Sequence, residues 1–315
     1  MEPALHIACT ADGRYAPYCA AMLHSLFVHN AHCAVTVHYL HPPEFEEGLK
    51  QQFGALAERY AARTYFHEVA DAAVASLPDM RGIERLVWYR IFLPELLPAL
   101  DRVLYLDADT LVLGSLDALW RTDLGGHPLA AVRNVIDPED RHHLAELGLP
   151  DDAPYFNSGV LLINLEAWRR DDCTTRLLEV ARQQGAAFLW ADQDALNLVF
   201  RDRCLLLHPR WNCQNSLCIG AGGRKVFGAQ AVEEATQQPG ILHFEGPDVR
   251  KPWHYLSEHP YRAQYWRHLR ASGFAVPGPE GRNWKTVIRK HAFWLWQPLH
   301  GLRHWWRAHS VQIKL

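Results

Sequence analysis

Two acidic residues, Asp107 and Asp109, follow directly on the strongly apolar segment Val103–Leu106. In an extended chain, side chains two residues apart project to the same face, so both carboxylates can converge on one cation. Carboxylate oxygens suit Mg²⁺ and Mn²⁺, and such an ion can in turn bind a diphosphate. The apolar run predicts a buried strand that delivers its acids to the carboxyl edge of an α/β sheet, where ligands of such folds bind. For this motif alone, a solvated turn is the alternative.

His243 is a further candidate metal ligand. It follows the apolar pair Ile241 and Leu242, which predicts a short buried strand, and imidazole is a suitable ligand for Mn²⁺. Gly246 and Lys251 come soon afterwards and could approach phosphate oxygens, one through its backbone and the other through its charge. A single histidine among 19 is more often a packed or surface residue, so this assignment depends on the neighbouring motifs.

Arg90 stands in the middle of an apolar segment, residues 84–97, that the pattern predicts as a helix. A charge in such a segment must either extend its head group to solvent or be paired. Extension to solvent is the ordinary case. The pairing partners would be the acids at the sheet edge or a diphosphate.

Two further groups of polar residues lie at the ends of predicted elements: Asn157, Ser158 and Gly159 before a strand at 160–165, and Asp192 and Gln193 at the start of a helix at 191–200. Amide and carboxylate groups near a sheet edge are suited to gripping sugar hydroxyls. For Asp192, an ordinary helix N-cap is the alternative.

The elements that must position these residues follow from the apolar runs. Strands are expected at 5–9, 35–40, 63–69, 129–132, 160–165 and 241–244, and helices at 17–30, 44–62, 84–97 and 191–200. A further β run is expected at 102–113, interrupted by the two carboxylates. Strands alternating with helices at this spacing predict a parallel sheet covered by helices.

Composition excludes several classes of protein. The chain has 315 residues, of which 49% are hydrophobic and 21% charged, so it is neither disordered nor fibrous. We expect no membrane-spanning segment and no secretory signal, because no apolar run is long enough and residues 1–10 lack a basic region. Its seven cysteines show no Cys-x-x-Cys spacing and are expected as reduced thiols, most of them in the core. The sequence also lacks the motifs of serine hydrolases, P-loop NTPases and zinc proteases.

Taken in order, the motifs resemble glycosyltransferase family 8, and in particular its bacterial lipopolysaccharide α-galactosyl- and α-glucosyltransferases. The matching segments span about residues 5–270: IACTADGRYAPY, YRIFLPELL, RVLYLDADTLVLGSLDALW, YFNSGVLLINLEAWR, ADQDALNLVF and LHFEGP with KPWH. The resemblance implies an α/β fold of the GT-A type, a mixed Rossmann-like sheet flanked by helices. It also implies a UDP-sugar donor, retention of anomeric configuration, and Mn²⁺ as the cofactor, with Mg²⁺ as the alternative.

The resemblance also assigns residues. It implies Asp107, Asp109 and His243 as metal ligands, and Asp192 and Gln193 as the residues beside the reacting sugar. It implies a donor site made of Thr10, Ala11, Asp12, Tyr15, Arg90, Asp107, Ala108, Asn157, Ser158, Gly159, Asp192, Gln193, Gly246 and Lys251. Arg14 departs from the family pattern in the nucleotide pocket, because close relatives often carry Asn at this position. Four residues separate Gly246 from Lys251, so either Arg250 or Lys251 would contact the diphosphate.

The resemblance therefore implies a hexosyltransferase that moves galactose or glucose from UDP-galactose or UDP-glucose to a glycan, the lipopolysaccharide core. The alternatives are a member of the family that acts on another glycan or on itself, and a non-catalytic UDP-sugar-binding protein of the same fold. Double displacement and front-face substitution are both compatible with retention.

The carboxyl-terminal segment differs in charge from the rest. The chain has 32 basic and 35 acidic residues, and seven of the basic ones but none of the acidic ones lie at 282–315. We expect three parts: a catalytic domain at 1–272, a Gly/Pro-rich linker at 273–282 and a tail at 283–315. Trp284, Val287, Ile288, His291 and Leu295 fall on one helical face, and five tryptophans accompany the basic residues. This pattern predicts an anchor on an anionic membrane surface, and hence an enzyme at the cytoplasmic face of the bacterial inner membrane. A helix packed on the body is one alternative and a nucleic-acid patch a more distant one, and we expect no nucleic-acid partner.

Overall fold

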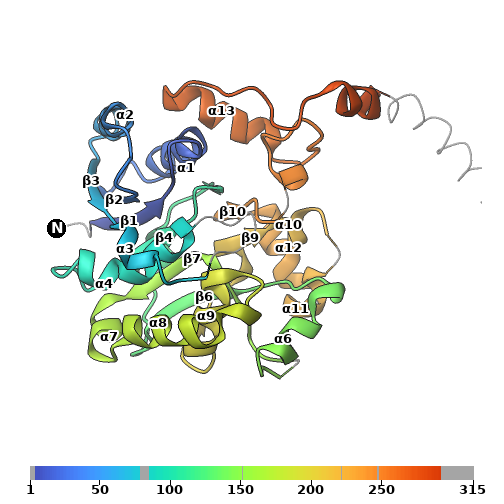
Figure 1. Cartoon of the computed structure of the whole chain (residues 1–315). Helices are drawn as coiled ribbons and strands as arrows, with labels where there is room; N and C mark the ends of the chain where they lie inside the picture. The colour runs from blue at the N-terminus through green and yellow to red at the C-terminus, as the bar shows by residue number, and fades with distance from the viewer. Residues whose placement is uncertain (1–3, 79–84, 151, 221, 247, 292–315) are drawn as a thin grey trace, which may run out of the picture.

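A mixed seven-stranded sheet forms the centre of the computed structural model, which describes residues 4–78, 85–150, 152–220, 222–246 and 248–291 (Figure 1). In sheet order the strands are β3 (Arg63–Glu68), β2 (Val35–His41), β1 (Leu5–Thr10), β4 (Arg102–Leu106), β7 (Phe156–Asn164), β6 (Leu129–Arg133) and β8 (Cys204–Leu206). All of them run parallel to β1 except β7, which is antiparallel to both of its neighbours.

Strand side chains alternate between two apolar layers. On β4, Val103 and Tyr105 pack on one face of the sheet, while Leu104 and Leu106 pack on the other. Helices α1 (Ala16–His29) and α2 (Glu47–Glu58) cover one face, and α7 (Leu165–Arg170), α8 (Cys173–Gln184) and α9 (Ala191–Phe200) cover the other (Figure 1). Because both faces are buried, the central strands are continuous apolar runs in the sequence.

A second, three-stranded sheet lies beside the carboxyl end of β4. Its order is β5 (Thr110–Val112), β10 (Ile241–His243) and β9 (Cys213–Gln214). In this sheet His243 pairs with Thr110 on one side and Gln214 on the other. The register therefore places His243 next to the end of the acidic turn.

The remaining short elements surround these sheets: α3 (Asp71–Val74), η1 (Arg85–Phe92), α4 (Leu93–Leu96), α5 (Asp117–Trp120), η2 (Pro138–Asp140), α6 (His142–Glu146), η3 (Gly185–Ala187), η4 (Pro209–Asn212), α10 (Asn215–Cys218), α11 (Gly223–Phe227), α12 (Ala229–Gln237), η5 (Asp248–Arg250) and α13 (Arg262–Ser272). Helix α13 packs along α1.

The spacing of the elements predicted a parallel sheet, which is wrong for the antiparallel strand β7. Two further predictions were wrong in detail. Residues 84–97 do not form one α-helix: η1 is a 3₁₀ helix, and α4 follows it as a single turn. Pro94 has no N–H to donate to the carbonyl of Arg90, so a regular α-helix cannot continue through this point. In addition, Asn157, Ser158 and Gly159 do not precede β7 but form its first half, because the strand begins at Phe156.

The segment at 273–282, expected as a linker, lies against the catalytic body. Phe274 is buried, and its ring lies 4.6 Å from that of Phe53. Glu280 accepts hydrogen bonds from the Tyr18 hydroxyl at 2.8 Å and the Trp253 indole at 3.1 Å. Residues 284–291 are helical, and the rest of the predicted tail, 292–315, lies outside the described residues. In the part of the chain that the structure describes, no helix has the length and apolar character to span a bilayer.

Candidate active site

The acidic turn is held in place from two sides. The Asp107 N–H donates to the carbonyl of Gly159 in β7 at 2.8 Å, and the Phe244 N–H, just after β10, donates to the carbonyl of Asp109 at 3.0 Å. The Thr110 N–H closes the turn itself on the Asp107 carbonyl at 3.1 Å. The end of β4 thus presents both carboxylates at the carboxyl edge of the sheet, as the sequence predicted.

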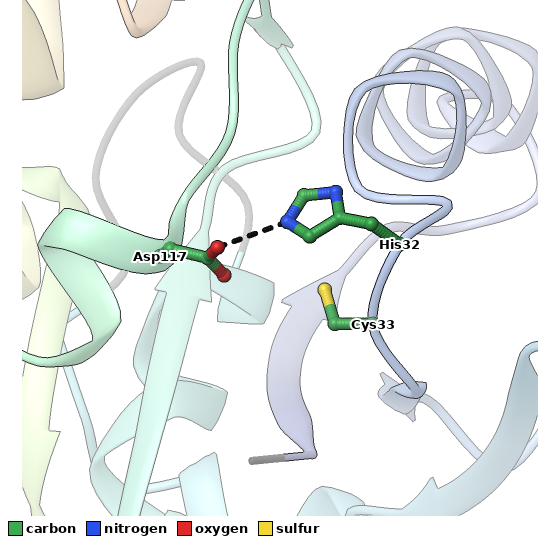
Figure 2. A group of neighbouring side chains, drawn as sticks. All are labelled: His32, Cys33 and Asp117. Carbon is green, nitrogen blue, oxygen red and sulfur yellow. Dashed lines mark hydrogen bonds and ion pairs between the residues drawn. The ribbon is translucent and has the colours of Figure 1, made fainter. Parts of the chain in front are cut away.

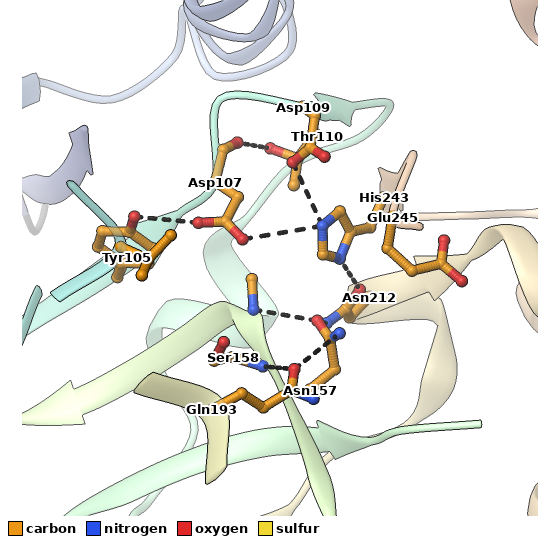
Figure 3. A network of polar contacts seen from close by, with 12 residues as sticks. Tyr105, Asp107, Asp109, Thr110, Asn157, Ser158, Gln193, Asn212, His243 and Glu245 are labelled. Carbon is orange, nitrogen blue, oxygen red and sulfur yellow. Dashed lines mark hydrogen bonds and ion pairs between the residues drawn. The ribbon is translucent and has the colours of Figure 1, made fainter. Parts of the chain in front are cut away.

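Asp107, Asp109 and His243 converge on one point (Figure 3). His243 Nε2 lies 3.3 Å from Asp109 Oδ1 and 3.8 Å from Asp107 Oδ2, and the three ligand atoms all lie within 4.8 Å of one another. Neighbouring ligands of a six-coordinate Mg²⁺- or Mn²⁺-sized ion are about 3 Å apart. The donor set therefore fits a divalent cation in both chemistry and spacing.

Hydrogen bonds fix which nitrogen of His243 faces the carboxylates. The Gly159 N–H donates to Asn157 Oδ1 at 3.0 Å, so that oxygen must receive the Asn212 amide nitrogen, 2.8 Å away, as a second donor. Asn212 Oδ1 is then the atom that lies 3.0 Å from His243 Nδ1, which must donate to it (Figure 3). Nε2 is left to face Asp107 and Asp109, which is the arrangement a metal-binding imidazole requires.

Neighbouring charges shift the pKa values of Asp109 and His243. Lys251 donates a hydrogen bond to Asp109 Oδ2. Although burial opposes it, the charges of Lys251 and His243 hold the pKa of Asp109 below its usual range. Burial lowers the pKa of His243, but the charge and hydrogen bond of Asp109, together with the charges of Asp107 and Glu245, raise it overall. A divalent cation and the Nε2 proton compete for the same place, so cation binding would release that proton.

Arg90 is paired rather than extended to solvent. It is 2% exposed, and its guanidinium lies 3.0 Å from Asp107 Oδ1 and 3.1 Å from Asp192 Oδ2. It also donates to the Ser158 carbonyl at 2.5 Å and stands 4.2 Å above the Tyr105 ring. The partners are the acids at the sheet edge, one of the possibilities considered from the sequence.

Asp192 is not a helix N-cap, because Trp190 occupies that position of α9 and the cap has no side-chain hydrogen bond. Burial raises the pKa of Asp192 to about 7; Arg90 opposes the shift, and the nearby charge of Asp107 adds to it. Asp194, the other acid of this motif, is fully buried and accepts hydrogen bonds from the Trp190 N–H at 2.9 Å and from His143 at 3.0 Å. Asp192 lines a cavity at this edge of the sheet, and Asp194 is not among the residues that line it.

Gln193 links the sugar-side residues to one another. Its Oε1 accepts hydrogen bonds from the Ser158 N–H at 3.0 Å and from the Asn157 amide at 3.2 Å. The same Asn157 side chain reaches Asn212, so Gln193 and His243 belong to one continuous network (Figure 3).

A two-lobed cleft brings every predicted site residue together. The larger lobe, about 480 Å³, is lined by Thr10, Ala11, Asp12, Tyr15, Ala108 and Lys251, and the smaller lobe, about 360 Å³, by Asn157, Ser158, Gly159, Asp192, Gln193 and His243. Arg90, Asp107, Asp109 and Gly246 line both lobes. The acidic turn therefore stands at the junction between them.

The larger lobe is shaped by the loop after β1. The Tyr15 N–H donates to Asp12 Oδ1 at 2.7 Å, and the Tyr39 hydroxyl donates to the Ala11 carbonyl at 3.2 Å. The ring of Tyr15 meets Trp253 edge-on, with 6.2 Å between the ring centroids. These contacts fix a tyrosine at the mouth of a cavity large enough for a nucleotide.

Lys251 and Arg250 lie in different lobes. Lys251 is buried beside Asp109 in the larger lobe, whereas Arg250 lines the smaller lobe and lies 3.9 Å from Asp137. Of these two residues, Lys251 is thus the one next to the acidic turn.

The sequence analysis missed several residues of the cleft. Asn212, which orients His243, and Asn134 and Glu245, which line the smaller lobe, were not singled out. Glu245 accepts hydrogen bonds from the backbone N–H groups of Asn215 and Ser216 at 2.6 and 3.3 Å. No local pattern marks Asn212, because its role depends on a contact 31 residues away.

A second group of possible metal ligands occurs within the described residues, at the opposite edge of the sheet. His32 and Cys33 lie just before β2, and His32 Nε2 is 3.0 Å from Asp117 Oδ2 at the start of α5 (Figure 2). None of these side chains lines the cleft.

Comparison with known proteins identifies the family of the chain. The model of glycosyl transferase family 8 matches residues 6–257. General stress protein A of Bacillus subtilis is 28% identical over 270 residues, covering 84% of this chain and 93% of that protein. Lipopolysaccharide 1,2-glucosyltransferase of Escherichia coli is 26% identical over 286 residues, covering 90% of this chain and 82% of that protein.

Among solved structures, the galactosyltransferase LgtC in complex with donor and acceptor sugar analogs is similar at a TM-score of 0.75 with 27% identity. The match covers 87% of this chain and 98% of that one. The predicted fold class, a GT-A type mixed sheet flanked by helices, is confirmed.

Gly159→Ala tests the ligand geometry. A Cβ at Gly159 would lie 2.2 Å from His243 Cε1 and 2.8 Å from Asp107 Oδ2, so both side chains must move. We expect divalent-cation affinity to fall by about tenfold or more, a loss of about 1.4 kcal/mol. Titration of Mn²⁺ followed by electron paramagnetic resonance would measure it.

Gly114→Ala is the matched control, because a Cβ there meets no atom within 4 Å. Its Mn²⁺ affinity should equal that of the unmodified protein. Equal affinity in both variants would show that Asp107 and His243 do not hold the ion.

Proposed function

The chain belongs to glycosyltransferase family 8, and we propose that it transfers galactose or glucose from a UDP-hexose to a glycan, with retention at the anomeric carbon and with the aid of a divalent cation. One observation carries this proposal: two carboxylates and an imidazole converge at the junction of two lobes, with Lys251 and Arg90 beside them. One lobe would hold the nucleotide, and the sugar would lie at the junction.

Asp107, Asp109 and His243 would hold Mn²⁺ or, alternatively, Mg²⁺. When bound, the ion would bind the diphosphate and offset the charge that develops on the departing phosphate. Lys251 and the Gly246 backbone lie where they would add to this, Lys251 exchanging part of its contact with Asp109 for a phosphate oxygen. Thr10, Ala11, Asp12 and Tyr15 would hold the uridine, and Ala108 would lie along the donor in the same lobe.

For the sugar we propose contacts with Asn157, Ser158 and Gly159 and a distinction between Asp192 and Gln193. The Gln193 oxygen already accepts two hydrogen bonds, whereas Asp192 lines the smaller lobe and has its buried Oδ2 held in an ion pair with Arg90. Above its raised pKa of about 7 Asp192 is ionised, and a carboxylate stabilises a developing sugar cation better than an amide does. We therefore assign Asp192 to the face of the reacting sugar and Gln193 to positioning Asn157 and Ser158.

The acceptor would enter through the smaller lobe, which is also lined by polar and acidic side chains such as Asn134, Asp137 and Glu245. A lipopolysaccharide core is the proposed acceptor, because the Escherichia coli relative is named for that substrate.

We also propose that the segment from residue 283 attaches the enzyme to the inner face of the bacterial cytoplasmic membrane. In its described part, Trp284 and Ile288 lie one helical turn apart and are 70% and 58% exposed. Lys290 fastens this helix to the body by donating to the Tyr255 carbonyl at 2.8 Å. Exposed apolar side chains beside basic residues are suited to an anionic lipid surface.

The reaction class is tested by release of UDP from UDP-galactose and UDP-glucose, with Mn²⁺ and with a chelator. We expect turnover of one donor that depends on the cation. Asp109→Asn should lower it about 100-fold or more, because it removes one ligand charge from the site. Asp202→Asn, an exposed acid far from the cleft, is the matched control and should leave turnover unchanged.

The possible results separate the alternatives. UDP binding with the cation but no turnover of any donor or acceptor would indicate a non-catalytic sugar-nucleotide-binding protein. No cation-dependent binding of UDP would contradict the donor site itself.

The roles of Asp192 and Gln193 are separated by their kinetic parameters. Asp192→Asn should lower kcat by about 100-fold with little change in KM, because the lost charge acts mainly in the transition state. Gln193→Ala should act more on KM, through loosening of Asn157 and Ser158. A larger loss of kcat in Gln193→Ala than in Asp192→Asn, in variants with unchanged urea unfolding, would reverse the assignment.

Membrane attachment is tested by co-sedimentation of the full chain with vesicles of anionic phospholipid. Replacing Trp284 and Ile288 by Asp should weaken binding, because both apolar contacts are lost and two negative charges face the lipid. Ile219→Asp, at an apolar position of the body that is 49% exposed, should leave binding unchanged. A chain ending after Gly281 that still sediments with the vesicles would contradict the proposal.

A further inference from the structure

Two cysteines lie in contact beside the cleft. Cys213 in β9 is 1% exposed, Cys218 at the end of α10 is half-buried, and their sulfur atoms are 3.6 Å apart. They are five residues apart in the sequence and lie between the surface and β9, the strand that pairs with the strand of His243. Neither thiol has a part in the proposed transfer reaction.

The surroundings of the two thiols differ. The side-chain contacts with Cys213 and with His259 lower the pKa of Cys218, although burial opposes this. The hydrogen bond with Cys218 and burial raise the pKa of Cys213. The His259 ring accepts the Tyr261 N–H at Nδ1, 3.2 Å away, so the neutral ring carries its proton on Nε2. Cys218 is also the more exposed of the two, so it is the sulfur that attacks an oxidant, and the buried Cys213 is the thiol that resolves the product.

We propose that Cys213 and Cys218 form a site of reversible oxidation by hydroperoxides, and that the resulting disulfide lowers the activity of the cleft. In the first step the Cys218 thiolate attacks the peroxide, giving a sulfenic acid and, with one proton, releasing water or an alcohol. In the second, the Cys213 sulfur attacks the sulfenic sulfur, losing its proton and expelling water. Two thiols are thus oxidised by two electrons, and one peroxide bond is reduced.

The link to the cleft runs through the neighbours of each cysteine. Asn212, which precedes Cys213, orients His243, and Asn215 and Ser216 of α10 donate their N–H groups to Glu245. A disulfide bond is about 2.05 Å long, so the two sulfurs must approach by about 1.5 Å. This movement draws the segment that contains Asn212 toward the segment that holds Glu245. Asn212 orients His243, and Glu245 lines the smaller lobe.

A second close pair of cysteines provides an internal control. Cys9 in β1 and Cys19 in α1 have sulfurs 3.8 Å apart, but both are fully buried. Burial raises the pKa of Cys9 well above its usual value, and the side-chain contact with Cys19 adds to the shift. This pair has the required proximity without access to solvent, so it should stay reduced in the folded protein.

The experiment treats the full-length reduced protein with hydrogen peroxide, alkylates it, and analyses its tryptic peptides by mass spectrometry. Cleavage after Arg210 and Arg224 yields one peptide that contains both Cys213 and Cys218. We expect this peptide to be lighter than the reduced form by two hydrogens and to carry no alkyl group. Cys9 and Cys19 should be alkylated in full once the protein is denatured.

Activity is measured on the same samples, and only this readout rests on the proposed function. Loss of an interaction that orients a metal ligand costs about tenfold or more, so turnover should fall by about that factor and recover with dithiothreitol. Cys218→Ser should retain the activity of the reduced protein and resist peroxide. Cys33→Ser, at the opposite edge of the sheet, should behave like the unmodified chain.

Three results would overturn the proposal. Alkylation of both cysteines in the 211–224 peptide after oxidation would exclude the site. A disulfide that leaves turnover unchanged would exclude the link to the cleft. Equal loss of turnover in Cys218→Ser would show that the peroxide acts elsewhere. A reduced protein without transferase activity would contradict the proposed function alone, because the peptide mass still decides whether the disulfide forms.

Discussion

The buried guanidinium of Arg90 is the contact on which the rest of the site depends. Moving a charge out of water costs several kcal/mol unless it is paired, and each carboxylate beside Arg90 carries the same cost. Arg90 meets Asp107 after β4, Asp192 in α9 and the Ser158 carbonyl in β7, so one side chain joins three elements of the fold. Because it engages Oδ1 of Asp107, it also leaves Oδ2 directed at His243. The ion pair between Arg90 and Asp107 therefore contributes both to the stability of the fold and to the orientation of a cation ligand.

Much of the fold could be predicted because strands buried on both faces leave long apolar runs. The end of β4 and the whole of α9 were identified in this way. The antiparallel direction of β7 could not be predicted, since an apolar run carries no information on the direction of the neighbouring strands. The segment that contains Arg90 was also misjudged: its apolar spacing resembles a helix, but an α-helix cannot continue through Pro94, and a 3₁₀ helix precedes it.

The residues of the candidate site also divide into those that the sequence reveals and those that it does not. Asp107 and Asp109 could be found because a strand end, a local feature, defines their position. Gly159 was recognised only as part of a motif, and its physical reason lies in the closeness of His243, which no local pattern reveals. Asn212 was missed altogether, because a buried asparagine gains its role from two distant partners. Residues that act by themselves are visible in a sequence, whereas residues that orient others become visible only when the chain is folded.

Asn157 couples the two halves of the cleft through its single amide group. Its oxygen accepts from the Gly159 N–H and from Asn212, and so determines which nitrogen of His243 faces the acids. Its nitrogen reaches Gln193, on the sugar side. An aspartate at this position would lack the N–H that Gln193 accepts and would add a charge to an already acidic site, and a leucine would leave several buried polar groups unpaired. Only an amide satisfies both sides at once, so the orientation of the metal ligand and the alignment of the sugar residues are set by the same side chain.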